Sequence, residues 1–210
     1  MTYTNPTLIF EACVETLEDA LDAEKRGANR IELCSALDQD GLTPSPELTM
    51  QCVHNLSIPV MAMVRPRGGN FVYTEAEITQ MEEEIQFFKQ AGVAGIVFGL
   101  LTESGKIDLE NTRQLAKLAF PLEVTFHKAI DYTTDIFQSF KELNDIREIT
   151  RVLTSGGKDT AHNGSEVLKQ MQNMPDRKIK IIAAGKILPE NREQIAEVTG
   201  ISELHGKRIV

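Results

Sequence analysis

The sequence predicts an α/β fold, a TIM-type (β/α)8 barrel of eight parallel strands whose eighth helix is short or missing. Short apolar, β-branched runs alternate with amphipathic helical patterns, and eight such runs can be counted. Strands that alternate with helices form a parallel sheet through right-handed crossovers. Eight repeats in 210 residues favour closure into a barrel over an open, doubly wound sheet.

Each expected strand is a short apolar run between helical patterns or turn residues. The eight runs comprise residues 8–14, 30–35, 60–65, 95–101, 123–129, 151–155, 179–184 and 202–206. The last run ends close to residue 210, which leaves no room in this chain for a full eighth helix.

The helical patterns between the runs carry their own start and stop signals. Residues 15–27 have apolar residues at helical spacing and end at a glycine, which is typical of a helix C-terminus. Residues 74–92 also end at a glycine and begin with Thr74 and Glu77, the pattern of a capping box. Ser45, Asp108 and Asn191 are further expected helix starts.

Composition indicates one domain, residues 1–210. A hydrophobic content of 41% is sufficient for one buried core, and no linker-like stretch divides the chain. The net charge of -9 argues against nucleic-acid binding, because no cluster of basic residues offsets phosphate repulsion. The chain shows neither a signal peptide nor an apolar stretch of roughly 20 residues. We therefore expect a cytoplasmic protein that does not bind membranes and keeps its three cysteines reduced.

A missing eighth helix affects assembly. The barrel wall between the first and seventh helices should be thin or apolar, and we expect a homo-oligomer contact there. Light scattering on the purified protein tests this expectation, and the mass of a strict monomer would contradict it.

One pattern occurs twice near the start of the chain. Glu11 and Cys13 lie two residues apart in the first expected strand, as do Glu32 and Cys34 in the second. Side chains alternate faces along a strand, so each Glu shares a face with its Cys. If the two strands are parallel neighbours, two thiols and two carboxylates meet on one wall. Adjacent strands lie ~4.8 Å apart, so pairing in register would let the two thiols share a soft metal such as Cu(I). The alternative is that the cysteines only pack as small apolar side chains, as buried cysteines often do.

Polar residues also lie near the ends of other expected strands, where barrel enzymes have their active sites. They are Arg65 and Arg67 after the third strand, His127 and Asp131 at the fifth, Ser155, Gly156 and Gly157 after the sixth, and His205 in the eighth. Ionisable groups are too frequent in this set for packing alone.

Among these residues, the RPRGG segment at 65–69 gives the clearest indication of a function. Its glycines let the backbone turn beside two guanidinium groups, which predicts an anion-binding turn. The alternative is that Arg65 neutralises Glu11 or Glu32 in the barrel mouth.

Residues at two more strand ends allow both a functional and a purely structural interpretation. The glycines after Ser155 fit a phosphate-binding turn, although such glycines are more often simply turn residues. His127 should face the same side as Thr125 and is a candidate general base or metal ligand. An isolated strand histidine is also often just hydrogen-bonded in the core.

Taken in chain order, these motifs resemble the CutC family of proposed copper homeostasis proteins. The segments are EACVETLEDALDAEKRGANRIELCSAL, GLTPS, IPVMAMVRPRGGNFVYT, GIVFGLLTESGKID, TFHKAIDYTTD, VLTSGG and ELHG. The resemblance implies a cytoplasmic, often oligomeric (β/α)8 barrel that binds copper through Cys13 and Cys34. Two segments depart from the family pattern: TFHRAFD is here TFHKAID, and PGGGI is here AAGKI.

Two functions follow from these observations. The first is copper homeostasis, with copper(I) bound by Cys13 and Cys34. The alternative is a TIM-barrel enzyme that acts on a small anionic substrate, a phosphate or a carboxylate. For the alternative, the expected anion-binding residues are Arg65, Arg67, Ser155, Gly156, Gly157 and His205, and the expected catalytic residues are Glu11, Glu32, His127 and Asp131.

Overall fold

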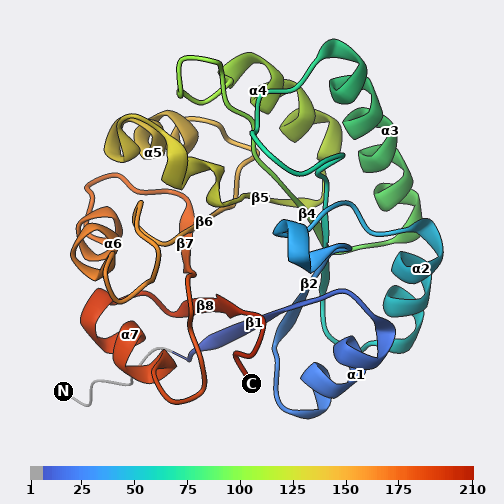
Figure 1. The fold of residues 1–210 in the computed structure, drawn as a ribbon, viewed down its shortest axis with the longest axis horizontal. Helices are drawn as coiled ribbons and strands as arrows, with labels where there is room; N and C mark the ends of the chain where they lie inside the picture. Colours follow the sequence, from blue (N-terminus) through green and yellow to red (C-terminus); the bar gives the residue numbers. More distant parts are fainter. Residues whose placement is uncertain (1–6) are drawn as a thin grey trace.

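The computed structural model describes residues 7–210 and forms a closed barrel of eight parallel strands in the order β1 to β8 (Figure 1). The helices form a ring outside the strands (Figure 1). The expected fold class is therefore confirmed. Residues 1–6 of the expected domain lie outside the described residues. No helix in the described part of the chain has the length and apolar character needed to cross a membrane.

Strands and helices alternate without exception from β1 to β8. The strands are β1 (Ile9–Val14), β2 (Arg30–Leu33), β3 (Val60–Met63), β4 (Gly95–Phe98), β5 (Glu123–Phe126), β6 (Arg151–Thr154), β7 (Lys180–Ala183) and β8 (Glu203–Gly206). The α-helices are α1 (Leu17–Lys25), α2 (Pro46–Asn55), α3 (Glu75–Ala91), α4 (Leu109–Ala119), α5 (Ile136–Asn144), α6 (Ser165–Gln172) and α7 (Arg192–Thr199). Two short 3-10 helices, η1 (Leu37–Gln39) and η2 (Lys128–Tyr132), follow β2 and β5.

Most helix boundaries have the local causes that the sequence predicted. Thr74 and Glu77 form the capping box of α3, and the helix ends at Gly92, whose φ of 81° suits glycine. Ser45 and Asp108 cap α2 and α4 through side-chain oxygens that accept backbone N–H bonds. Asn191 precedes α7 but makes no such capping bond.

Six of the eight strands end one to three residues before their expected runs do, whereas β1 and β8 end as expected at Val14 and Gly206. The runs 95–101 and 123–129 continue beyond β4 and β5 as residues that are buried except for Lys128, the first residue of η2. His127 is the N-cap of η2, where its side chain accepts from the backbone N–H of Ala129. Apolar character thus persists into the loops because these loops are buried at the barrel mouth. As expected, residues 207–210 form no helix.

The apolar core has an outer layer and smaller inner clusters. The outer layer lies between strands and helices and includes Ile31, Ile96 and Phe126, which are fully buried. Burying each such side chain contributes about 1.5–3 kcal/mol. Inside the barrel, Met61 and Val97 pack in a cluster with the two mouth cysteines.

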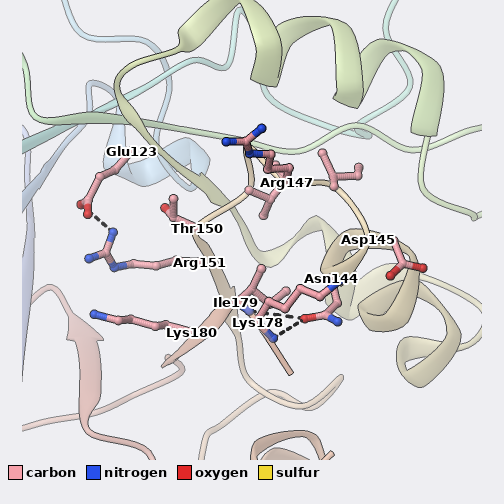
Figure 2. Close-up of a pocket in the computed structure, with 11 residues that line it drawn as sticks. Glu123, Asn144, Asp145, Arg147, Thr150, Arg151, Lys178, Ile179 and Lys180 are labelled. Atoms are coloured by element: carbon pink, nitrogen blue, oxygen red, sulfur yellow. Dashed lines mark hydrogen bonds and ion pairs between the residues drawn. The ribbon is translucent and has the colours of Figure 1, made fainter. Parts of the chain in front are cut away.

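Charged side chains fill much of the remaining barrel interior. Arg30 donates to the carboxylates of Glu11 and Glu203, with 2.9 Å between Arg30 Nη2 and Glu203 Oε2. Arg151 donates to Glu203 at 2.8 Å. It also donates to Glu123 at 2.6 Å, as Figure 2 shows. We call these five residues the barrel ion network. A carboxylate buried there without a cation would be costly, so each charge depends on its neighbours.

Replacing Arg30 by Met tests this dependence. We expect the free energy of unfolding to fall by about 3 kcal/mol, because two buried carboxylates lose a partner. The loss stays at the low end of the range for broken buried pairs since Glu11 keeps His205 and Glu203 keeps Arg151. Urea denaturation measures the change.

The matched control is Arg26→Met, at the carboxyl end of α1. Arg26 pairs with Asp22 at 3.3 Å, but both side chains are more than half exposed. This variant should lose less than about 1 kcal/mol. Equal losses in the two arginine variants would contradict a structural role for the network.

Candidate functional site

A cavity of about 220 Å³ lies at the mouth formed by the carboxyl ends of the strands. We call it the mouth cavity. Its lining residues are Cys13, Glu32, Leu37, Asp40, Met63, Arg65, Phe71, His127, Lys128, Tyr132, Leu153, His205 and Lys207. Active sites of this fold lie at this end of the barrel.

The repeated Glu and Cys pattern does form one wall, with a stagger between the strands. β1 and β2 are parallel neighbours, and their register places Cys13 opposite Glu32 and Glu11 opposite Arg30. The expected in-register pairing of the two cysteines is therefore wrong. Their sulfur atoms are nevertheless 3.9 Å apart, diagonally across the two strands. Stagger of this kind accompanies the strand tilt that closes a barrel.

His205 joins the two carboxylates of this wall. The register of β8 with β1 places it opposite Glu11, and its Nδ1 lies 2.9 Å from Glu11 Oε1. Its Nε2 lies 3.6 Å from Glu32 Oε2. Burial favours the neutral imidazole, but the carboxylate of Glu32 and hydrogen bonds to Cys13 and Glu11 outweigh it. The pKa of His205 is therefore raised well above its usual value.

This environment shifts the pKa values of Glu11 and Glu32 in opposite directions. Burial alone would raise the pKa of Glu11, yet Arg30 and His205 together lower it to about 2. Glu32 pairs with no arginine among the described residues, so burial dominates and its pKa is raised despite the nearby His205. Its Oε1 is buried and has no hydrogen-bond partner among the described residues.

Both thiols are held in the protonated form. The pKa of Cys13 is raised well above its usual value by its hydrogen bond with Cys34, by burial and by the charge of Glu32. The pKa of Cys34 is lowered by the hydrogen bond from Cys13, but burial and Glu32 outweigh this and the net change is upward. A metal ion would thus have to displace these protons on binding.

Among the described residues, three ligand types meet on this wall. One ligand atom each from Cys13, Glu32 and His205 can be chosen so that all lie within 4.8 Å of one another. Both nitrogens of His205 already face carboxylates, so ligation through that residue would break an existing contact. Cys34 Sγ likewise donates to Glu32 Oε2 at 3.7 Å, so a metal held by the two sulfur atoms would replace that weaker contact.

The two arginines of the RPRGG segment have different surroundings. Arg65 is buried and pairs with no carboxylate among the described residues, so it does not neutralise Glu11 or Glu32. Its guanidinium donates to the carbonyl oxygens of Gln39, Asp40, Gly41 and Gly69 at 3.1 to 3.3 Å. Arg67 lies outside the mouth cavity and binds Glu77 at 2.5 Å. Both arginines hold loops in place.

The glycine-rich turn after β6 already binds an anion from the chain itself. Asp131 accepts from the backbone N–H of Ser155 at 2.9 Å and of Gly157 at 2.8 Å. It also accepts from the hydroxyl groups of Thr154 and Ser155. The turn therefore positions η2 beside the mouth, with its amides directed at Asp131.

His127 lies at the mouth in one defined neutral form. Burial, aided by the charge of Arg65, lowers its pKa to about 3. Nδ1 accepts from the Ala129 N–H at 3.1 Å, so the ring proton is on Nε2. Nε2 has no partner in the described structure. Gly99 makes room for the ring, since a Cβ there would come within 2.6 Å of His127 Cε1.

A second hollow of about 680 Å³ lies at the opposite end of the barrel, beside the amino ends of β6 and β7 (Figure 2). Arg151 and Lys180 border it, and both are bound to Glu203 of the barrel ion network. The charged side chains that border this hollow therefore stabilise the interior of the barrel.

Sequence reasoning missed several residues of the barrel interior and its mouth. Arg30 lies two residues before Glu32, and Glu203 lies two residues before His205. Alternation along a strand therefore predicts that Arg30 and Glu203 also point into the barrel. Asp40 and Lys207 lie in loops and line the cavity only because the chain folds back over it. Nothing local in the sequence signals that position.

These features define a TIM-barrel protein whose mouth combines a pair of buried thiols with carboxylates and histidines. A family model, that of the CutC family, matches residues 8–210. The chain is 40% identical over 197 residues to the mouse copper homeostasis protein cutC homolog, covering 94% of this chain and 72% of the mouse protein. It is also 40% identical over 197 residues to a CutC family protein of Vibrio vulnificus, covering 93% and 78%.

Solved structures agree with this assignment. A candidate copper homeostasis protein CutC from Streptococcus agalactiae superposes with a TM-score of 0.91 at 32% identity, covering 97% of this chain and all of that one. A candidate deoxyribose-phosphate aldolase from Coccidioides immitis has a TM-score of 0.70 at 12% identity, covering 98% of this chain and 85% of that one, a likeness of fold alone. The chain belongs to the CutC family, as the motif resemblance predicted.

The low pKa of Glu11 predicts a pH dependence of stability. A carboxyl group whose folded pKa of about 2 lies below its unfolded value of 4.5 stabilises the protein above the unfolded value. This contribution is lost as the pH falls from about 4.5 to about 2. We expect the Glu11→Gln variant to be less stable at neutral pH and to lose less stability on acidification.

Urea unfolding of both proteins between about pH 6 and pH 3 measures the difference. The two curves of unfolding free energy against pH should converge toward low pH. Parallel curves would show that Glu11 has no depressed pKa.

Proposed function

We propose that this protein acts in copper homeostasis by binding one Cu(I) ion between Cys13 and Cys34. The observation that carries the proposal is the pair of buried sulfur atoms 3.9 Å apart. A metal ion with thiolate bonds of about 2.3 Å, the length typical of zinc, spans up to about 4.6 Å between two sulfurs. Small side-chain adjustments therefore suffice for two-coordinate binding.

The donor set suits a soft ion. Thiolates select Cu(I) over hard cations such as Mg²⁺, which prefer carboxylate and water oxygens. Met61 and Met63 belong to the same buried cluster as the two cysteines and exclude water on one side. The names of the mouse and human relatives, copper homeostasis protein cutC homologs, support the same metal.

The surrounding charges determine the cost of binding. Each thiol must lose its proton, and two thiolates with one Cu(I) leave one net negative charge on the wall. His205 lies next to Cys13 and offsets that charge. Proton competition means that Cu(I) affinity falls as the pH falls.

Burial also indicates the kind of copper handling. Cys13 is 6% exposed and Cys34 is fully buried, at the ends of rigid strands. Copper chaperones that exchange ions rapidly need accessible thiols, whereas these thiols favour slow exchange. Storage or buffering of Cu(I) fits this position better than delivery to a partner.

Anaerobic titration with Cu(I) against a competing chelator tests the proposal. The wild type should bind about one Cu(I) tightly, and Cys13→Ala/Cys34→Ala should abolish tight binding, because the alanines remove both sulfur ligands. Thermal unfolding verifies that the double variant remains folded.

The matched control is Cys52→Ala in α2. Cys52 is fully buried, but it packs in the outer core with no second cysteine. This variant should bind Cu(I) as the wild type does. Weak binding that survives removal of Cys13 and Cys34 would show that these thiols only pack.

A second candidate function is an enzyme that acts on a small anionic substrate. One observation favours it: Glu32 and His127 each line the mouth cavity and each carry a buried polar atom without a partner in the described part of the chain. Lys128 and Lys207 line the same cavity as Arg65, whose Nε is buried without a partner in the described structure, and all three can donate to an anion. Loss of metabolite-dependent thermal shifts in Lys128→Met supports this candidate, and unchanged shifts oppose it.

A further inference from the structure

Cationic side chains outnumber carboxylates in the lining of the mouth cavity, in a chain that is acidic as a whole. Four cationic side chains line it, those of Arg65, Lys128, His205 and Lys207. Within the described residues of the lining, two carboxylates, Glu32 and Asp40, oppose them. Two carboxylates outside the lining also contact these cations, Glu11 at 2.9 Å from His205 Nδ1 and Asp131 at 3.6 Å from Lys128 Nζ, so anion binding here depends on individual donors and not on a net local charge.

Three of these cations retain free hydrogen-bonding capacity: Arg65, whose Nε is buried without a partner in the described structure, and the two lysines. The Lys128 Nζ atom lies 3.1 Å from Ser155 Oγ and 3.6 Å from Asp131. The Lys207 Nζ atom donates to the carbonyl of Leu37 at 2.8 Å. An ammonium group has three protons, so each lysine keeps at least one donor for a ligand.

His127 supplies a fixed neutral donor to the same lining. The residue is 4% exposed, its ring lies 5.0 Å from the Phe71 ring between centroids, and its Nε2–H has no partner among residues 7–210. An unpaired donor buried in this way costs free energy unless a ligand or water accepts from it. The position is fixed before any ligand arrives, because the Ala129 N–H holds Nδ1.

The remaining wall and the volume restrict the ligand. Leu37, Met63, Phe71 and Leu153 make part of the lining apolar. A cavity of about 220 Å³ is comparable to roughly seven water molecules at about 30 Å³ each. A phosphate group would be expected at glycine-rich amides, but those after β6 are bound to Asp131. The lining thus fits a short carbon chain with a carboxylate end.

We infer that the mouth cavity binds a small organic carboxylate through Lys128, Lys207 and the Nε2–H of His127. The inference deepens the second candidate function and requires neither copper nor a particular reaction. Asp40 is an opposing charge in the lining and weakens carboxylate binding. Its backbone is in the left-handed region with φ 64°, which asparagine also tolerates.

Isothermal titration with propionate, succinate and inorganic phosphate tests the inference, with thermal shift as a second readout. Lys128→Met and His127→Phe should each weaken carboxylate binding at least about tenfold, since each removes one donor to the anion. Asp40→Asn should strengthen binding, because it removes a negative charge and leaves the loop conformation acceptable. Lys169→Met, on the exposed surface of α6, is the control and should change nothing.

The outcomes separate this site from the copper site. Carboxylate binding that responds in both directions to these variants, with unchanged Cu(I) affinity of Lys128→Met, supports the inference. No binding of either carboxylate at tens of millimolar overturns it, as does preferential binding of phosphate. Binding that is indifferent to Lys128→Met also overturns it. That variant alters only a partly exposed side chain, so this outcome holds even where His127→Phe has a folding defect.

Discussion

The contact between Arg30 and Glu11 inside the barrel is the interaction on which the rest of the structure depends. Arg30 links Glu11 of β1 to Glu203 of β8, and Arg151 continues the network toward the amino ends of the strands. Most barrels of this fold fill their interior with branched apolar side chains. Here the buried charges make each inward residue depend on its neighbour, which restricts substitution along the whole network.

The same network extends to the mouth and sets the chemistry there. Arg30 and His205 together lower the pKa of Glu11, and Glu32, with hydrogen bonds to Cys13 and Glu11, raises the pKa of His205. His205 in turn lies between Glu11 and Glu32 and next to Cys13. The thiols consequently lie beside a fixed positive charge rather than beside unscreened carboxylates. This explains how two thiols can occupy a wall that contains two acidic residues.

The mouth combines two kinds of chemistry. The sulfur atoms of Cys13 and Cys34 lie in an apolar cluster suited to a soft ion. Lys128, Lys207 and His127 line the same cavity and offer donors suited to a carboxylate. The two proposed ligands are compatible because they use different atoms of one cavity. Simultaneous binding would place the carboxylate next to the metal, where it would limit access of solvent to the thiols.

Local sequence was sufficient to predict the barrel, its helix caps and the shared inward face of Glu11, Cys13, Glu32 and Cys34. These features depend on periodicity and short-range hydrogen bonds, which are encoded in consecutive residues. The folded chain was needed to show which inward residues meet, because strand stagger paired Cys13 with Glu32. Long-range contacts likewise assigned the glycine-rich turn to Asp131 and the guanidinium of Arg65 to backbone carbonyls. Such partners come from segments far apart in the chain, and no local pattern specifies them.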